Sequence, residues 1–122
     1  MPTILIVEDE AHIRQFVAIN LRARGYETLT AECAEDGIEL LKAGNRPQVL
    51  ILDIKLPGMS GWDMLNMIDH DSELPKLPVI VMTASSVLSQ PNEYMYTNIV
   101  EKLNKPVSVA ELMRAVNSVF ND

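Results

Sequence analysis

Three short, unbroken apolar runs limit the folds open to this chain. They span residues 3–7, 49–52 and 78–82. A strand with one face in water alternates apolar and polar residues, whereas a run without a polar break is typical of a parallel strand buried on both faces. Weaker strand patterns lie at residues 26–32 and 99–103. The sequence therefore predicts five strands, with the three apolar runs inside a parallel sheet.

Helical periodicity occupies most of the intervals between these strands. Apolar residues recur at helical spacing in residues 13–21, 34–41, 64–68 and 109–120. Arg14 falls outside the apolar stripe of the first stretch, and the last stretch begins with the capping-box pattern Ser108-x-x-Glu111. Residues 85–98 are the least regular, and we expect only a short helix there. It would start near Pro91, because proline is tolerated in the first turn of a helix.

Strand and helix patterns thus alternate five times in a chain of 122 residues. Short connections and right-handed crossovers turn this order into an α/β fold, a doubly wound parallel sheet with helices on both faces. The length suits one domain, residues 1–122. In such sheets ligands bind beyond the carboxyl ends of the strands. The residues that follow each strand are therefore the first candidates for a functional site.

Composition excludes several classes of function. The formal net charge is −7, which argues against direct binding to nucleic acid or to anionic membranes. Cys33 is the only cysteine, so the chain can form no internal disulfide and no cysteine-rich metal site. No apolar run approaches the roughly 18 residues of a membrane span, and no basic leader opens the chain. We expect a cytoplasmic protein.

Polar residues follow four of the predicted strands. Glu8 and Asp9 follow the first strand, Asp53 the third, Thr83 the fourth and Lys105 the fifth. If these strands are neighbours in one parallel sheet, three carboxylates, a hydroxyl and an ammonium meet at one edge. Each residue alone also has an ordinary explanation, as a helix-start acid, a turn residue, a strand-end hydroxyl or a surface lysine. Their joint order and spacing favours a site.

The charges of this set indicate its chemistry. Three close carboxylates repel one another by several kcal/mol unless a cation lies among them. Mg²⁺ suits such a cluster, because it takes one or two carboxylates and keeps positions for water and phosphate oxygens. Asp53 could act as the nucleophile of a phosphoryl transfer. Lys105 would then offset negative charge, and the Thr83 hydroxyl could donate a hydrogen bond to a phosphoryl oxygen.

Four segments resemble the receiver domains of two-component response regulators, and the resemblance covers nearly the whole chain. The segments read IVEDE at 6–10, LDIKLPGMSG at 52–61, VMTA at 81–84 and NKP at 104–106. The resemblance implies a flavodoxin-like (βα)5 fold with strand order 2-1-3-4-5. It also implies that Asp53 accepts a phosphoryl group from a histidine kinase or a histidine phosphotransfer protein.

The same resemblance assigns further roles. Asp9, Asp53 and the backbone carbonyl of Lys55 would bind Mg²⁺, and Glu8 would act largely through water. The bond between Lys105 and Pro106 is typically cis in this family. The protein would be a monomer or a weak dimer and would switch binding to a downstream protein of unknown identity, without contacting nucleic acid or membrane.

One position departs from the family pattern. Receivers usually carry Tyr or Phe three residues before the lysine of the Lys-Pro pair, and here that position is Lys102. A lysine keeps its ammonium in water, so it cannot fill the apolar slot that the aromatic ring occupies. We therefore predict that the face formed by the last two helices and the fifth strand signals by a modified route, or that a partner reads another surface.

Two other functions fit parts of the pattern. An aspartate-nucleophile phosphohydrolase also places an aspartate after a parallel strand, but it needs a second acid two residues later, where this chain has Lys55. A phosphate-independent interaction module could share the fold. A nucleotide-binding protein is disfavoured, because the loops contain no glycine-rich phosphate cradle. We expect a switch that catalyses only its own phosphorylation and dephosphorylation.

Overall fold

The computed structural model describes residues 2–83 and 98–120 of the chain. Five strands form one sheet in which every neighbouring pair is parallel, in the order β2-β1-β3-β4-β5. They are β1 (Thr3–Val7), β2 (Glu27–Ala31), β3 (Val49–Asp53), β4 (Val79–Thr83) and β5 (Ile99–Asn104). The predicted fold class and strand order are confirmed. Each strand end lies either at the predicted residue or one residue away from it.

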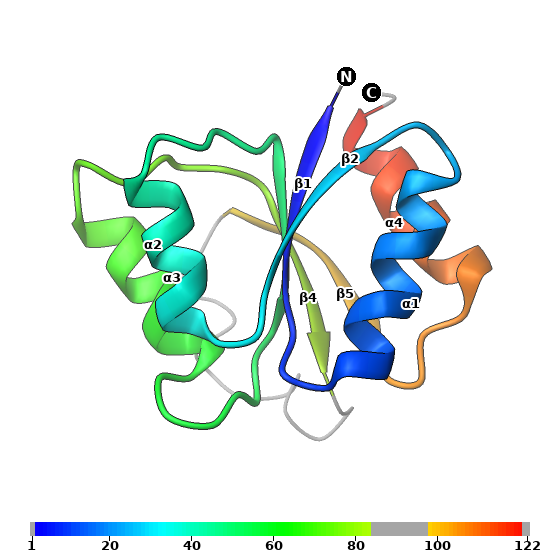
Figure 1. Ribbon diagram of the computed structural model, residues 1–122, viewed down its shortest axis with the longest axis horizontal. Helices are drawn as coiled ribbons and strands as arrows, with labels where there is room; N and C mark the ends of the chain where they lie inside the picture. The colour runs from blue at the N-terminus through cyan, green and yellow to red at the C-terminus, as the bar shows by residue number, and fades with distance from the viewer. Residues whose placement is uncertain (1, 84–97, 121–122) are drawn as a thin grey trace.

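Four described helices cover both faces of this sheet: α1 (Ala11–Arg22), α2 (Ala34–Lys42), α3 (Gly61–His70) and α4 (Val109–Phe120). Figure 1 shows α1 and α4 on one face and α2 and α3 on the other. None of the described helices has the length and apolar character needed to cross a membrane. The helix expected near Pro91 lies outside the described residues.

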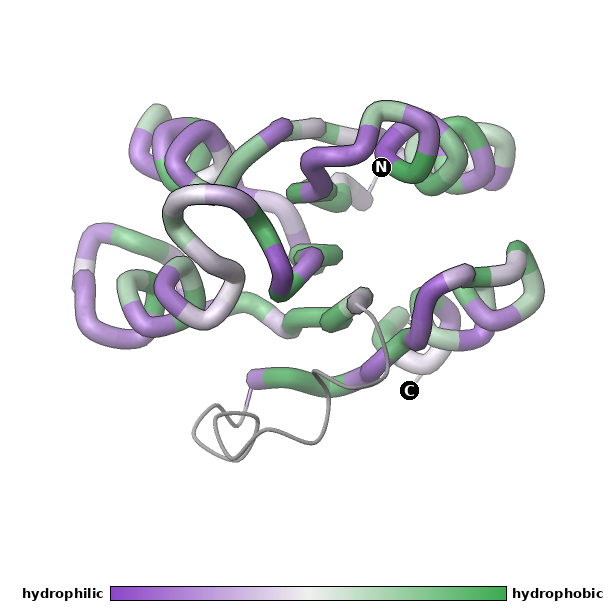
Figure 2. The backbone as a smooth tube through the Cα atoms, turned by 90° about the horizontal axis from the view of Figure 1, so that it is seen from below, coloured by the Kyte–Doolittle hydropathy of each residue, from purple (hydrophilic) through white to green (hydrophobic). Residues whose placement is uncertain are grey.

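The apolar runs explain the two cores. Successive side chains of a strand point to opposite faces, so a continuous apolar run supplies both faces at once. In β1, Leu5 and Val7 belong to the core under α2 and α3, whereas Ile4 and Ile6 belong to the core under α1 and α4. Figure 2, viewed along the strands, shows the mainly hydrophobic strands between the two pairs of helices.

The helix ends show one expected cap and one that the sequence reasoning missed. Ser108 Oγ accepts a hydrogen bond from the Glu111 amide at 3.1 Å, as the predicted capping pattern requires. A complete capping box also opens α3, where Ser60 Oγ accepts from the Asp63 amide and Asp63 accepts from the Ser60 amide, each at 3.1 Å. The sequence signal for this second cap is the pattern Ser60-x-x-Asp63.

Gly61 fixes how closely α3 approaches the end of β3. Its amide donates to the Ile54 carbonyl at 2.9 Å. A Cβ atom at Gly61 would lie 2.6 Å from Ile54 Cα and 2.7 Å from the Asp53 carbonyl oxygen. Real Cβ atoms do not come so close to backbone, so this position needs glycine. The contact holds the turn between β3 and α3 tightly around Asp53.

Candidate functional site

The side chains predicted to meet at the edge of the sheet do meet there. A cavity of about 220 Å³ is lined by Asp9, Glu10, Asp53, Lys55, Thr83 and Lys105. Because the strands are parallel, their carboxyl ends share the lower edge of the sheet in Figure 1, the edge that faces the viewer in Figure 2. Glu10 was not among the predicted site residues. It joins the site because it follows directly on the acid pair.

Lys105 makes the shortest contacts between charged groups of the site. Its Nζ lies 2.9 Å from Asp53 Oδ2 and 2.9 Å from Glu8 Oε1. The Lys105 amide donates to the Thr83 carbonyl at 2.9 Å, and the bond from Lys105 to Pro106 is cis. One ammonium group therefore bridges Glu8, which follows β1, and Asp53, the last residue of β3, as the order of strands predicted.

Asp53 is held at both carboxylate oxygens. Oδ1 accepts a hydrogen bond from the Lys55 amide at 3.0 Å, and Oδ2 accepts one from the Lys105 ammonium. The residue is only 2% exposed. Its carboxylate is thus buried, oriented and turned toward the cavity, which are the conditions that a positioned nucleophile needs.

Three carboxylates offer a ligand set for a hard cation. One oxygen each of Glu8, Asp9 and Asp53 lies within 4.8 Å of the other two. Glu8 and Asp53 are buried, and Asp9 is exposed to solvent. All donors are oxygens, which Mg²⁺ prefers, and the exposed side leaves positions for water or phosphate oxygens. The residues present therefore fit Mg²⁺.

Burial perturbs the protonation of this cluster. Desolvation raises the pKa of Glu8 from 4.5 to about 7, although hydrogen bonds from Lys105 and from the Glu10 amide oppose the increase. Burial would lower the pKa of Lys105, but the hydrogen bonds to Glu8 and Asp53 outweigh it and raise that pKa. The lysine consequently stays charged, while Glu8 can take up a proton near neutral pH.

Thr83 brings a hydroxyl to the same cavity. The residue is 1% exposed, and within residues 2–83 and 98–120 its Oγ1 has no hydrogen-bond partner. Buried hydroxyls are nearly always hydrogen-bonded, so an unsatisfied one needs an explanation. A group that enters the cavity and accepts a hydrogen bond would supply it.

The sequence predicts the exposure of Lys102 but not the direction of the Arg14 side chain. Lys102 lies in β5 opposite Val81 and is exposed, in agreement with the expectation that it does not fill an apolar slot. The sequence pattern indicates only that Arg14 lies outside the apolar stripe of its helix. In the structure its guanidinium turns toward the loop after β1 and donates to the Glu8 carbonyl at 2.8 Å.

Comparison with known proteins identifies the family. The response regulator receiver domain matches residues 4–117. The chain belongs to this family. As a receiver domain it is a signalling component of two-component systems and acts as a switch.

Relatives of this receiver domain include a transcriptional regulator and a receiver domain protein of known structure. It is 32% identical over 118 residues to the phosphate regulon transcriptional regulatory protein PhoB of Pseudomonas aeruginosa, covering 97% of this chain and 51% of PhoB. The chain thus spans about half the length of this relative. A receiver domain protein of Clostridium thermocellum matches with a TM-score of 0.85 and 32% identity, covering 99% of this chain and 95% of that chain.

A second structural relative is the response regulator TrrA of Thermotoga maritima. It matches with a TM-score of 0.83 and 30% identity, covering 98% of this chain and 99% of that chain. That structure was determined in complex with Mg²⁺ and BeF. The receiver domain described here thus shares its fold with a regulator that binds this cation.

Proposed function

We propose that Asp53 of this receiver accepts a phosphoryl group and that Mg²⁺, bound by Asp9, Asp53 and the Lys55 carbonyl, supports the transfer. The observation that carries the proposal is the buried Asp53 carboxylate, fixed by the Lys55 amide and the Lys105 ammonium beside two further carboxylates. The structure of TrrA, which is 30% identical to this chain and was determined in complex with Mg²⁺ and BeF, supports the proposed binding of Mg²⁺.

The residues divide the work of the transfer. An Asp53 oxygen attacks the phosphorus of the donor, so one P–O bond forms while the donor's bond to phosphorus breaks and its electron pair leaves with the donor. Lys105 then offsets charge on the phosphoryl oxygens, and the Thr83 hydroxyl donates to one of them. Mg²⁺, when bound, supplies additional positive charge. Glu8 holds Lys105 in place and would contact the cation through water.

The natural donor in this proposal is a histidine kinase or a histidine phosphotransfer protein. A groove of about 390 Å³ adjoins the site and is lined by His12, Ile13, Phe16, Lys105, Pro106 and Val107. Lys105 lines both cavities, so a protein seated in the groove would lie next to the cavity that Asp53 lines. The apolar side chains of α1 and of the segment after β5 suit the apolar face of a donor helix.

The rival functions receive less support from the site. A phosphohydrolase of the aspartate-nucleophile type needs an acid two residues after the nucleophile, and Lys55 occupies that position. A phosphate-independent module would have no use for an oriented, buried carboxylate. We therefore propose that the chain catalyses only its own phosphorylation and dephosphorylation, in the cytoplasm.

Phosphorylation with a small donor tests this function. The protein is mixed with Mg²⁺ and acetyl phosphate or phosphoramidate, and its mass is measured. We expect a gain of one phosphoryl group that Asp53→Asn abolishes and the exposed matched control Asp36→Asn retains. Steady release of phosphate from varied esters would favour a hydrolase. No modification under any condition would favour the phosphate-independent module.

A further inference from the structure

We propose that Arg14 is a positioning residue for the acid pair Glu8 and Asp9. In this inference, which rests on the proposed Mg²⁺ site, the guanidinium holds the backbone of the loop between β1 and α1. The two carboxylates then face the cation before it binds. Arg14 touches neither the cation nor Asp53, and it acts through the loop.

The contacts of Arg14 are with the carbonyl side of that loop. Its Nη1 donates to the Glu8 carbonyl at 2.8 Å and to the Asp9 carbonyl at 3.4 Å. The side chain is only 14% exposed. One nitrogen therefore bridges two consecutive carbonyls, which fixes the orientation of the peptide group between the two acids.

The position of Arg14 in its helix makes these contacts informative. Arg14 lies in the first turns of α1, near the positive end of the helix dipole, where a cation is normally unfavourable. The N-cap residue Glu10 makes no side-chain cap, and the first turn contains no acid. The first carbonyl to accept a hydrogen bond within the helix is that of Glu10, which accepts from the Arg14 amide. The carbonyls of Glu8 and Asp9 come before it and lie outside the helix. Hydrogen bonds from the guanidinium to those two carbonyls offset its unfavourable position.

The loop needs such support because of its charges. Lys105 offsets charge on Glu8 and Asp53, but without a cation the Asp9 carboxylate still lies close to both and is repelled by them, which favours an opened loop. The Glu8 amide donates to Ala31 at 3.1 Å, and Glu8 Oε2 accepts from the Glu10 amide at 3.0 Å. These bonds fix Glu8. The backbone at Asp9 is instead fixed by the hydrogen bonds from Arg14 to the Glu8 and Asp9 carbonyls.

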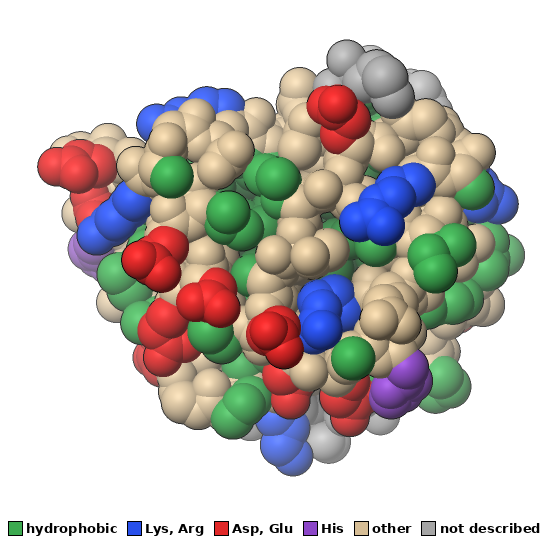
Figure 3. Space-filling view, in the orientation of Figure 1, with side chains coloured by type: hydrophobic (Ala, Val, Ile, Leu, Met, Phe, Trp, Pro, Cys, Tyr) green, Lys and Arg blue, Asp and Glu red, His purple; other side chains and the backbone are tan. Residues whose placement is uncertain are grey.

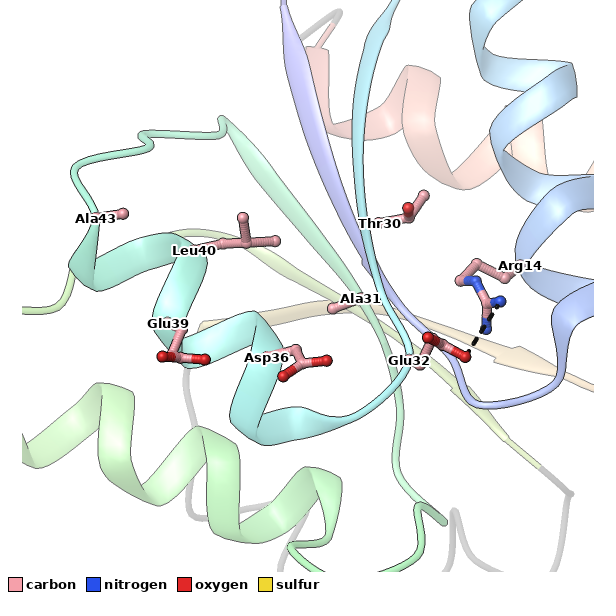
Figure 4. Close-up of a pocket in the computed structure, with 8 residues that line it drawn as sticks. All are labelled: Arg14, Thr30, Ala31, Glu32, Asp36, Glu39, Leu40 and Ala43. Atoms are coloured by element: carbon pink, nitrogen blue, oxygen red, sulfur yellow. Dashed lines mark ion pairs between the residues drawn. The ribbon is translucent and has the colours of Figure 1, made fainter.

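A second contact of Arg14 supplies an internal control. Figure 4 shows the side chain reaching from α1 toward Glu32, which follows β2, at a groove whose other acids come from α2. The distance between Arg14 Nη2 and Glu32 Oε1 is 3.8 Å, and the Glu32 side chain is 75% exposed. Figure 3 shows that acidic side chains gather in this part of the surface. An exposed, distant pair is screened and contributes little, so Glu32 should be dispensable for the site.

Mg²⁺ binding to four proteins tests the inference: the parent, Arg14→Met, Arg14→Lys and Glu32→Gln. Calorimetry gives the Kd for Mg²⁺, and denaturant unfolding without Mg²⁺ reports stability separately. Partners that orient metal ligands typically change metal affinity by about 10- to 100-fold when removed. We expect Arg14→Met to raise the Kd at least about tenfold and Glu32→Gln to change it less than about twofold. Lysine can place one donor near both carbonyls, so Arg14→Lys should recover most of the affinity.

Phosphorylation by acetyl phosphate gives a second measurement. In Arg14→Met the Mg²⁺ concentration for half-maximal rate should rise about tenfold, while the maximal rate stays within about twofold of the parent. If Arg14 only stabilised the fold, Arg14→Met would lower the free energy of unfolding without raising the Mg²⁺ concentration for half-maximal rate. If Arg14→Met does not fold, Arg14→Gln, which is too short to reach both carbonyls, replaces it.

The outcomes separate this inference from the proposed function. Unchanged Mg²⁺ affinity in Arg14→Met would overturn the positioning role and leave the Mg²⁺ site intact. An equal loss in Glu32→Gln would also overturn it, because the exposed pair would then organise the loop. A parent that binds no Mg²⁺ and accepts no phosphoryl group would contradict the proposed function itself.

Discussion

The ammonium of Lys105 lies 2.9 Å from Oε1 of Glu8, a carboxylate in a residue with no exposed surface. A buried carboxylate is costly unless it is paired or protonated. Here both solutions are available, because Lys105 supplies the partner and burial raises the pKa of Glu8 to about 7. Protonation of Glu8 should therefore affect stability in the neutral range of pH.

The raised pKa predicts that Glu8 makes the Mg²⁺-free protein less stable as pH increases. The folded state binds a proton with a pKa of about 7 and the unfolded state with one of 4.5. Between these values the folded chain carries more protons, so the free energy of unfolding falls as pH rises and levels off above about pH 7. Below about pH 4.5 the contribution is constant.

Denaturant unfolding of the parent and of Glu8→Gln across this range measures the effect. The glutamine variant cannot titrate at this position, so the difference between the two free energies isolates Glu8. We expect that difference to change by an amount on the order of 3 kcal/mol in the stated direction. A pH-independent difference would mean that Glu8 titrates alike in the folded and unfolded states.

Removal of Lys105 should destabilise the fold more at high pH than at low pH. Lys105→Met leaves two buried carboxylates, Glu8 and Asp53, without their shared partner. At about pH 8 we expect a loss of roughly 3 kcal/mol, because breaking a buried ion pair strands a charge. At about pH 5.5 protonation of Glu8 relieves part of that loss. Lys42→Met, which removes the 3.8 Å pair between exposed Lys42 and half-buried Asp71, should cost less than about 1 kcal/mol at either pH. Equal losses in the two variants would contradict this account of the site.

The sequence predicted the sheet and the site because both depend on strand order. Short continuous apolar runs are typical of strands buried on both faces, and parallel strands place their carboxyl ends on one edge. Asp53, Thr83 and Lys105 could therefore be brought together without coordinates. Their roles in binding Mg²⁺ and phosphate remain predictions, as does the altered signalling route expected from Lys102.

Other features needed coordinates because they depend on burial and direction. The sequence shows Glu8 and Asp9 as equivalent neighbours, yet Glu8 is buried and Asp9 is exposed. A side chain at the start of α1 can point along the helix or back over the loop, and local pattern does not distinguish the two. Arg14 points back, and its position in a first turn that contains no acid was the available signal.

Gly61→Ala should destabilise the protein and disturb the site together. The new Cβ would lie 2.6 Å from Ile54 Cα, a backbone atom that cannot yield without moving the turn. We expect a loss of at least about 2 kcal/mol, in the range of overpacking substitutions. Gly44→Ala is the control, because its φ is +102° but its Cβ would meet no atom within 4 Å. Backbone strain alone should cost that variant about 1 kcal/mol. If the two alanine variants unfold alike in denaturant titrations, the close approach of α3 to β3 is not limiting.

Saturating Mg²⁺ should stabilise the parent, because a ligand that binds only the folded state shifts the folding equilibrium. At a concentration about 100-fold above Kd the gain is roughly 2.7 kcal/mol, seen as a higher Tm. Asp9→Ala removes one of the two carboxylates proposed to bind the cation directly and should lose most of that gain. Glu39→Ala removes the same charge from the exposed face of α2 and should keep it, so the comparison separates ligation from a general change in charge. A parent whose Tm does not respond to Mg²⁺ at any concentration, or an Asp9→Ala variant that responds as strongly as Glu39→Ala, would show that these carboxylates do not form a cation site.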